Sequence, residues 1–359
     1  MKARKVAIIG IVGLPASYGG FETLAEHLLS GLRDKFSFTV YCSSRRYRER
    51  KREYLGARLK YLPLNANGPE SVIYDFVSLL HSAFSSDVLL VLGVSGGILL
   101  PFLRWKRVIL NIGGLDWERS KWGWIAKHWL RISEAMAVRS ADVLIADNQG
   151  IADYLQRAYD RQSVLIEYGG DHVPLSPITD EKKESYPFLG RPYCFSVARI
   201  QPDNNIETIL DAFAQSPEHK LVFVGNWGQS KWGRNIKRRY GSHPNIQLLE
   251  AIYDVEMLNV LRGHCELYIH GHSAGGTNPS LVEAMHLRLP IVAFDVVYNR
   301  ATTEGHAKFF KNATDLAKLL RETAKAEWEA QRRIMKEIAD RRYCWATITD
   351  KYAQFIASA

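Results

Sequence analysis

Short apolar segments alternate with longer amphipathic segments along almost the whole chain, and this alternation limits the fold more than any other feature. Segments such as Val6–Ile9 and Val88–Leu92 have the length of buried strands, and the stretches between them have helical spacing. Strands that alternate with helices predict α/β domains with parallel sheets and helices on both faces. The predicted strands are 6–9, 38–41, 59–62, 88–92, 108–111, 143–146, 164–166, 193–197, 220–224, 246–249, 267–270 and 291–294.

The alternation is interrupted once, at residues 171–192. This stretch contains four prolines and a cluster of charged residues, which is the composition of a linker. The chain has 359 residues, more than one ordinary domain needs. We therefore expect two Rossmann-like domains of similar size, 1–172 and 193–340, joined by the linker 173–192.

Positive charge is concentrated in one segment of the first domain. The chain has a net charge of +9, and Arg33–Lys60 alone holds ten basic and three acidic residues. Such a segment suits anionic lipid, phosphate-bearing substrates or nucleic acid, and solubility alone is a further explanation. Because no nucleic-acid-binding motif is present, we do not expect nucleic acid as a partner.

The cysteines and the apolar runs indicate the cellular location of the protein. Cys42, Cys194, Cys265 and Cys344 are far apart in sequence, which is typical of reduced thiols in the cytoplasm. We expect no signal peptide, and the longest uncharged run, 88–103, is too short to span a bilayer. No Asp-x-Asp triplet or histidine pair with ligand spacing occurs, so we expect neither a metal ion nor another cofactor.

A glycine-rich loop, Gly13–Thr23, follows the first predicted strand and opens a helix. Free backbone amides at a helix N-terminus suit a phosphate, and the pair Gly19-Gly20 permits close backbone approach. The spacing Gly10-x-x-Gly13 differs from the G-x-G-x-x-G of dinucleotide-binding folds, which argues against that class. A tight turn without any ligand remains an alternative.

A second polar loop, Ser273–Met285, follows the strand 267–270. Its glycines offer backbone amides, Pro279 suits the first turn of a helix, and Glu283 lies one turn further on, where its carboxylate could accept from sugar hydroxyls. These groups could cradle a nucleotide sugar. An N-capped helix with no ligand is the alternative.

Two further motifs lie where predicted strands end, which is where open α/β sheets bind ligands. Arg199 follows the first strand of the second domain, where its guanidinium could hold a diphosphate or form a structural salt bridge. The stretch Asn111–Trp122 mixes polar groups with Trp117, which indicates either a platform for a sugar or a buried aromatic corner.

Taken in order, these motifs resemble family-4 glycosyltransferases of the GT-B fold, and more narrowly the bacterial rhamnosyltransferase-like branch of surface-polysaccharide biosynthesis. The resemblance covers nearly the whole chain, and 275–285 is its most specific part. The matching stretches are 15–23, 114–122, 168–171, 198–205, 270–285, 294–300 and 303–305.

The resemblance implies a GT-B fold of two domains facing across a cleft, with a helix at 341–359 packing back on the first domain. The nucleotide-sugar donor would bind mainly to the second domain and the saccharide acceptor to the first. The implied catalytic residues are Arg199, Asp116 and Glu22. The implied donor-binding residues are Gly19, Gly20, Arg199, Asn204, Ile252, Gly275, Gly276, Thr277, Asn278, Ser280 and Glu283, and the implied acceptor-binding residues are Tyr18, Phe21, Glu22 and Trp117.

The chain departs from the family at several of these positions. Gly275 and Asn204 stand where the broader family has a glutamate and a lysine, as they do in the rhamnosyltransferase branch. That branch usually reads Asp-Gly-Leu-Glu-Trp where this chain has Gly113–Trp117, and Ser17 replaces a usual arginine.

The expected activity is a metal-independent, retaining transfer of a 6-deoxyhexose, with rhamnose from dTDP-rhamnose as first choice. The acceptor would be a lipid-linked or growing polysaccharide, and the protein would lie at the inner face of the cytoplasmic membrane, docked through Arg33–Lys60. A nucleotide-sugar epimerase or hydrolase, and a donor-binding protein without activity, are the alternatives.

Overall fold

The computed structural model describes residues 3–17, 19–68, 70–119 and 122–358. The chain forms two compact units. Met1–Tyr168 and Trp345–Ala359 make the first unit, and Gly169–Cys344 makes the second. Residues 173–192, the predicted linker, are therefore part of the second unit.

The described part of the first unit contains an eight-stranded sheet with the order β3-β4-β2-β1-β5-β6-β7-β8. Neighbouring strands are parallel apart from the hairpin of β3 and β4. The strands are β1 (Arg4–Ile9), β2 (Phe36–Ser43), β3 (Glu53–Tyr54), β4 (Ala57–Leu62), β5 (Val88–Leu92), β6 (Arg107–Asn111), β7 (Val143–Ala146) and β8 (Val164–Leu165).

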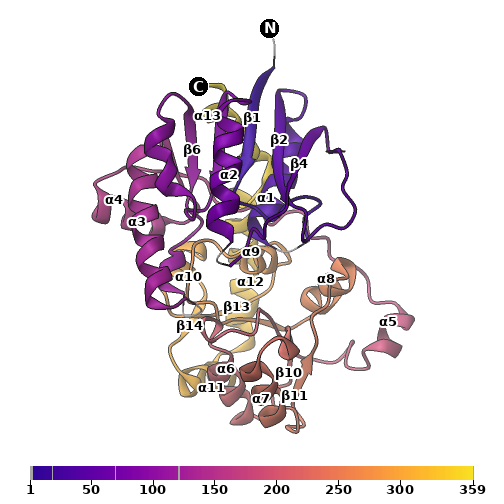
Figure 1. The fold of residues 1–359 in the computed structure, drawn as a ribbon. Coiled ribbons are helices and arrows are strands. Elements are labelled where there is room, and N and C mark those ends of the chain that lie inside the picture. Colours follow the sequence, from indigo (N-terminus) through magenta and orange to yellow (C-terminus); the bar gives the residue numbers. More distant parts are fainter. Residues whose placement is uncertain (1–2, 18, 69, 120–121, 359) are drawn as a thin grey trace. The chain divides into compact units, whose positions relative to one another are not determined.

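Helices cover both faces of this sheet. The α-helices are α1 (Gly20–Leu32), α2 (Ser71–Ala83), α3 (Trp124–Ser140), α4 (Gln149–Tyr159) and α13 (Trp345–Ala357), and the 3-10 helices are η1 (Gly97–Leu103) and η2 (Asp116–Glu118). Along the sheet, the step from β1 to β2 goes toward β3, whereas the step from β4 to β5 goes toward β8. Because both crossovers are right-handed, α1 and α2 lie on opposite faces of the sheet. In Figure 1, α2 and α3 lie in front of the sheet, whereas α13, which contacts α1, lies behind it.

The described part of the second unit contains a six-stranded, wholly parallel sheet with the order β11-β10-β9-β12-β13-β14. The strands are β9 (Cys194–Val197), β10 (Leu221–Val224), β11 (Ile246–Leu249), β12 (Leu267–His270), β13 (Ile291–Phe294) and β14 (Lys308–Phe310). The α-helices are α5 (Asp180–Ser185), α6 (Ile206–Ala214), α7 (Lys231–Tyr240), α8 (Val255–Gly263), α9 (Pro279–His286), α10 (Val297–Thr302), α11 (Ala313–Glu322) and α12 (Lys325–Arg342), with 3-10 turns η3 (Pro202–Asn204) and η4 (Trp227–Gln229).

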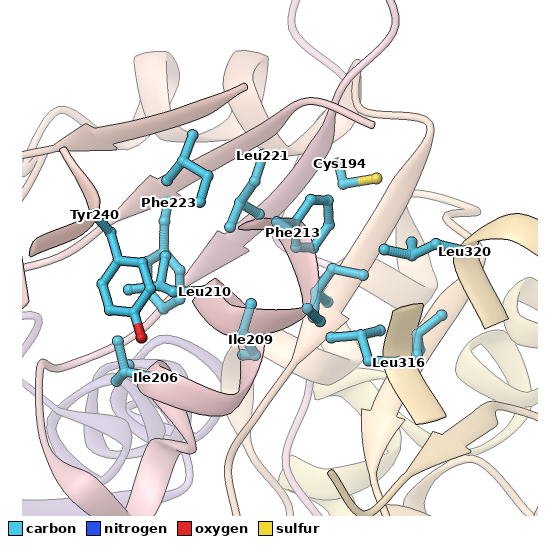
Figure 2. Packing of buried hydrophobic residues seen from close by; sticks show 14 of the residues in the cluster. Cys194, Ile206, Ile209, Leu210, Phe213, Leu221, Phe223, Tyr240, Leu316 and Leu320 are labelled. Atoms are coloured by element: carbon cyan, nitrogen blue, oxygen red, sulfur yellow. The ribbon is translucent and has the colours of Figure 1, made fainter. Parts of the chain in front are cut away.

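The apolar face of α6 forms the centre of one core in the second unit. Ile209, Leu210 and Phe213 are buried and recur at helical spacing. Figure 2 shows them between the strands that carry Cys194, Leu221 and Phe223 and the helix that carries Leu316 and Leu320. This packing fixes α6, and therefore the loop that leads into it from β9.

The C-terminal helix α13 belongs structurally to the first unit. The rings of Trp345 and His27 stack with their centroids 4.0 Å apart. The Asn111 amide, at the end of β6, donates to the buried Tyr352 hydroxyl at 2.8 Å. The last helix therefore supports the strand end that precedes the Gly113 loop.

None of the described helices combines the length and the apolar character that a membrane-spanning segment needs.

Candidate functional site

In each unit the strand order reverses between two neighbouring parallel strands. The reversal lies between β1 and β5 in the first unit and between β9 and β12 in the second. Loops that leave the carboxyl ends of such strands diverge, and open α/β sheets bind ligands there. The loops after these four strands contain or lead to most of the predicted site residues.

In the second unit, hydrogen bonds join the loop after β9 to the loop after β12. The Asp203 carbonyl accepts from the Ser273 backbone amide at 2.9 Å and from the Ser273 hydroxyl at 2.7 Å. The Asn205 amide donates to the Gly271 carbonyl at 2.8 Å. The two loops are thus fixed to each other before any ligand binds.

Asn204 lies at the centre of this junction. Its side-chain NH₂ donates to the Arg199 carbonyl at 2.6 Å, and its Oδ1 lies 2.7 Å from His272 Nδ1. Because this oxygen can only accept, His272 must carry a proton on Nδ1. Where the broader family has a lysine, this chain therefore has a residue whose amide links two loops. His272, which sequence analysis did not single out, is its partner in the second loop.

The glycine-rich part of the second loop is buried. Gly275, Gly276 and Thr277 are all inaccessible or nearly so, although the sequence suggested exposed amides. Gly275 has φ = 108°, a conformation that favours glycine over the glutamate of the broader family. The positive φ angle of this loop is therefore one that Gly275 can adopt without strain.

Asn278 caps helix α9, as the simpler interpretation of this motif predicted. Its Oδ1 accepts from the Ser280 backbone amide at 3.0 Å and from the Ser280 hydroxyl at 2.8 Å. Pro279 occupies the first helical position, where no amide donor is required. The cap directs the N-terminus of α9, with its partial positive charge, toward the carboxyl edge of the sheet.

Glu283 is the centre of a buried polar cluster. One of its carboxylate oxygens pairs with Arg262 of α8, whose side chain is 2% exposed, and the other lies 3.5 Å from His172 Nε2. Asn259 accepts a further hydrogen bond from Arg262 at 3.2 Å. Arg262 and His172 were not predicted, because they lie 21 and 111 residues from Glu283 and belong to no local motif.

The charge state of Glu283 follows from this cluster. Burial alone would raise the pKa of its carboxyl group, but Arg262 and His172 outweigh burial and hold the pKa below its ordinary value. Glu283 is therefore an anion with a fixed orientation, as a carboxylate that binds ribose hydroxyls requires. By contrast, burial and the neighbouring His272 hold the pKa of His270 well below its usual range, so His270 is neutral.

Arg199 and Ile252 lie in two loops of the same sheet edge. Arg199 is exposed in the loop after β9, and Ile252 is half-buried in the loop after β11, two strands away. Asn204 is thus bonded to the backbone of Arg199, whereas Glu283 is held by a separate cluster. Ile252 lies toward one side of the sheet.

In the first unit, two glutamates of α1 hold the loop after β1. Glu22 is buried and accepts from the Val12 backbone amide at 2.8 Å. Glu26, one turn later, accepts from the Ala16 backbone amide and from the Tyr54 hydroxyl, each at 2.8 Å. Gly19 and Gly20 lie at the start of α1, and Tyr18, a predicted acceptor-binding residue, lies outside the described residues.

Gly113 and Phe21 meet at the carboxyl edge of the first sheet. Gly113 has φ = 62°, and a Cβ atom at this position would overlap the Phe21 ring. The aspartate that the related branch usually has here would therefore require both a strained backbone and a displaced Phe21. The glycine is consistent with the rest of this site rather than an isolated loss.

Asp116 and Trp117 follow in η2. Arg119 pairs with Asp116 at 2.8 Å. The Trp117 indole N–H donates to Glu134 at 3.2 Å, and the Arg131 guanidinium lies 4.1 Å from the centre of its ring. These contacts favour a structural role for Trp117, which was the alternative to a sugar platform. Its predicted role in acceptor binding remains a hypothesis.

A buried carboxylate that sequence analysis missed also lies at this edge. Asp75 of α2 is 6% exposed and accepts from the hydroxyl of Ser95, in the loop after β5. Burial raises the pKa of Asp75 to about 7, although Ser95 and the Gly96 amide lower it in part. Its sequence context, a single Asp within an apolar helix, gave no signal of this contact.

Among residues 3–17, 19–68, 70–119 and 122–358, no group of three or more His, Cys, Asp or Glu side chains is arranged to hold a metal ion.

We predict that Arg262→Leu lowers the free energy of unfolding by about 3–5 kcal/mol, because it leaves the charge of Glu283, whose side chain is only 16% exposed, without its main partner. The double variant Arg262→Leu/Glu283→Leu should recover most of this loss, since it removes both charges. Urea unfolding measures both effects. The matched control is Arg238→Leu on the exposed side of α7, which should change stability by less than about 0.5 kcal/mol. A single variant as stable as this control would contradict the assigned ion pair.

We predict that the free energy of unfolding of the Asp75→Asn variant, compared with that of the wild type, increases as pH rises. The folded protein keeps the Asp75 proton up to about pH 7, whereas the unfolded chain releases it near pH ~4. The stability of the wild type contributed by this group is thus greatest below pH ~4 and is lost as pH rises through 7. Urea unfolding of both proteins at pH 5 and pH 8 should show the variant gaining stability relative to the wild type, and Asp180→Asn, at an exposed site, is the matched control. A difference independent of pH would contradict this assignment.

Two family models match the chain in succession. The model described as a domain of unknown function (DUF1972) matches residues 3–171, and the model described as glycosyl transferases group 1 matches residues 178–342. A search of curated proteins found no match.

Solved structures resemble the chain over its full length. Sucrose-phosphate synthase from Thermosynechococcus elongatus has a TM-score of 0.82 at 17% identity, covering 99% of this chain and 100% of that one. HepE from Anabaena, solved with UDP and glucose, has a TM-score of 0.74 at 15% identity with the same coverage. A glycosyltransferase from Rickettsia africae has a TM-score of 0.73 at 11% identity, covering 100% of this chain and 99% of that one.

At these identities the structures establish the fold, and the family model matches most of the second unit. The chain has the two-domain α/β GT-B fold, and its residues 178–342 match the model of the group 1 glycosyl transferases.

Proposed function

We propose that this glycosyltransferase moves a 6-deoxyhexose, rhamnose as first choice, from dTDP-rhamnose to a lipid-linked or growing polysaccharide of the bacterial surface. The observation that carries the proposal is the oriented Glu283 carboxylate, one turn after the start of α9 and within the segment that matches the group 1 family. A carboxylate whose orientation is already fixed can accept from two ribose hydroxyls without reorganising.

The donor would lie along the loops after β9 and β12. Glu283 would hold the ribose, Ile252 would contact the base, and Arg199 with the loop amides would hold the diphosphate. Gly275, Gly276, Thr277, Asn278 and Ser280 line the loop that would surround the sugar. The exposure of Arg199 supports this role, because an accessible guanidinium can approach a ligand.

The choice of rhamnose rests on two residues that follow the rhamnosyltransferase-like branch. Gly275 and Asn204 replace a glutamate and a lysine of the broader family. A site without that glutamate lacks one hydrogen-bond acceptor for the sugar hydroxyls. This loss suits a 6-deoxy sugar, which has one hydroxyl fewer than a hexose.

The reaction would proceed without a metal ion or a covalent enzyme intermediate. The bond between the anomeric carbon and the diphosphate oxygen breaks, and its electron pair stays on the diphosphate. The acceptor hydroxyl forms the new bond on the same face of the sugar, and its proton passes to the departing diphosphate. The protein would position both substrates, and Arg199 would stabilise the negative charge that develops.

The acceptor would bind to the first unit, close to Phe21 and Glu22, with Asp116 and Trp117 beyond Gly113. A lipid-linked acceptor requires the protein to work at the inner face of the cytoplasmic membrane. The basic segment Arg33–Lys60 would attract anionic lipid there, at about 1 kcal/mol per basic residue close to the surface.

The proposal is tested by nucleotide release. Purified protein is incubated with dTDP-rhamnose, GDP-fucose and several UDP-sugars, with and without membrane lipid extract. We expect release of dTDP that depends on the extract. Release from a different donor alone would refute the assigned sugar, and release without acceptor would favour a hydrolase or an epimerase instead.

In the same assay, Arg199→Ala should lower kcat/KM by about a hundredfold to a thousandfold, because it removes a charge that acts on the leaving group. Arg238→Ala, an exposed arginine on α7, is the matched control and should leave turnover unchanged. If Arg199→Ala turns over like this control, Arg199 is not part of the site.

A donor-binding protein without activity is the second candidate, and Gly113 favours it. The carboxylate that the related branch has at this position is replaced, and the Phe21 ring occupies the adjacent space. Saturable binding of one donor with no release under any acceptor condition would support this candidate over the transferase.

A further inference from the structure

Helix α2 exposes an apolar stripe on its outer side. Ile73, Phe76, Leu80 and Phe84, the last at the helix C-terminus, recur at intervals of three or four residues and are 40–83% exposed. This spacing places them on one face of the helix. The opposite face carries the buried residues Tyr74, Asp75 and Leu79. The helix is therefore apolar on a side that the protein itself does not cover.

The apolar surface continues onto the neighbouring elements. Phe102 and Trp105, at the end of η1, are 67% and 63% exposed, and Trp124, Ile125 and Ile132 of α3 are exposed as well. Helix η1 contacts both α2 and α3, and Figure 1 shows α2 and α3 on the same face of the sheet. We call this surface, formed by the exposed side chains of 71–84, 97–107 and 124–140, the outer face of α2–α3.

The charges on the outer face of α2–α3 have one sign. Its three segments contain two carboxylates, Asp75 and Glu134, which are 6% and 0% exposed. Asp75 bonds to Ser95, and Glu134 accepts from Trp117 and from the hydroxyls of two tyrosines. The same segments contain six basic residues, but Lys106 donates to the Ser86 carbonyl and Arg107 to Ser358. The other four are Arg104, Lys127, Arg131 and Arg139. Glu118, in η2 beside α3, is an exposed carboxylate close to Lys127 and Arg131.

This face adjoins the basic segment Arg33–Lys60. Arg45 pairs with Glu70, the residue before α2, at 2.8 Å. Further along the helix, the Lys60 amine lies 3.0 Å from His81 Nε2. The apolar stripe and the most basic stretch of the chain therefore lie next to each other in the first unit.

We infer that the outer face of α2–α3 docks on an anionic lipid bilayer, with its aromatic side chains inserted at the level of the headgroups. Phe and Trp side chains surrounded by Lys and Arg are the composition of protein surfaces that lie on membranes. Exposed apolar patches of this extent mark interaction sites. The sign of the charge selects an anionic partner.

A second copy of the chain fits this face less well. In a two-fold symmetric dimer the same patch faces itself, so its basic residues would be brought together. Like charges brought together across an interface oppose association. A lipid surface offers the opposite charge and is therefore the occupant that the residues favour.

The inference deepens the proposed function, since it names the surface that would bring the enzyme to a lipid-linked acceptor. It also differs from docking through Arg33–Lys60 alone. Binding by basic residues alone needs no apolar side chain, whereas binding by this face requires the exposed Phe and Trp residues.

The test is flotation of the full-length protein with vesicles of phosphatidylcholine containing phosphatidylglycerol. The variant Phe84→Ser/Trp105→Ser/Trp124→Ser removes three of the most exposed aromatic side chains, and its exposed positions leave the core intact. The matched control, Leu175→Ser/Tyr253→Ser/Val297→Ser, changes three exposed apolar residues of the second unit. We expect the aromatic variant to bind at least about tenfold more weakly than the wild type and the control to bind normally.

A second variant, Arg104→Gln/Lys127→Gln/Arg139→Gln, should weaken binding to these vesicles and reduce its dependence on salt. Equal flotation of the aromatic variant and the wild type would overturn the inference. A wild type that does not float would overturn it too, and in that case a dimer that the aromatic variant dissociates would assign the face to a second copy.

Donor turnover separates this inference from the proposed function. Vesicle binding that depends on the three aromatic residues, in a protein that releases nucleotide from no donor, would leave the docking surface standing and refute the transferase. Transfer to an extracted acceptor by a wild type that never binds vesicles would do the reverse.

Discussion

The second unit depends on the parallel pairing of β9 with β12, two strands about 70 residues apart in the chain. Leu267 pairs with Cys194 and Tyr268 with Phe195, so both strands release their loops at the same edge. Loop backbone at such an edge has polar groups that the sheet does not satisfy, and buried polar groups need partners. Asp203, Asn204 and Ser273 supply those partners. The geometry around Arg199 therefore follows from strand order first and from side-chain chemistry second.

Asp75 and Glu134, which are buried, and Glu283, whose side chain is 16% exposed, are three carboxylates that this protein stabilises in different ways. Glu283 pairs with a buried arginine, which keeps it ionised. Glu134 accepts from Trp117, Tyr154 and Tyr159, yet burial still raises its pKa because none of these donors is charged. Asp75 has a hydroxyl and one amide, and its pKa rises furthest, to about 7. Of the three, Glu283 is the ionised carboxylate, and it lies where we expect a ligand with hydroxyl groups. Its ionisation state thus separates a candidate binding group from the two structural carboxylates.

The sequence was sufficient to predict the elements that depend on local hydrophobic periodicity. The strands 88–92 and 246–249 have the predicted bounds, and Pro279 lies in the first turn of α9 as predicted. It did not predict β3 or β14, because two- and three-residue strands are too short to show a period. Arg262, His172 and His272 were missed for another reason: their roles arise only when distant segments pack together. The steric relation of Gly113 to Phe21 likewise required a structure, since the two residues are 92 positions apart.

Asp75 and Glu134 also connect the inside of the first unit with its surface. Both lie on helices whose outer sides are apolar, and both direct their carboxylates inward, toward Ser95 and Trp117 in the loops after β5 and β6. One consequence is that these loops at the candidate acceptor site are held by hydrogen bonds that they donate to carboxylates of α2 and α3. The other is that neither carboxylate reaches the surface to balance Lys127, Arg131 and Arg139, where Glu118 of η2 is the exposed carboxylate close to the first two. The same two side chains that stabilise the site loops therefore leave the outer face of α2–α3 positively charged, so changes to the inner side of these helices would also change what their outer side attracts.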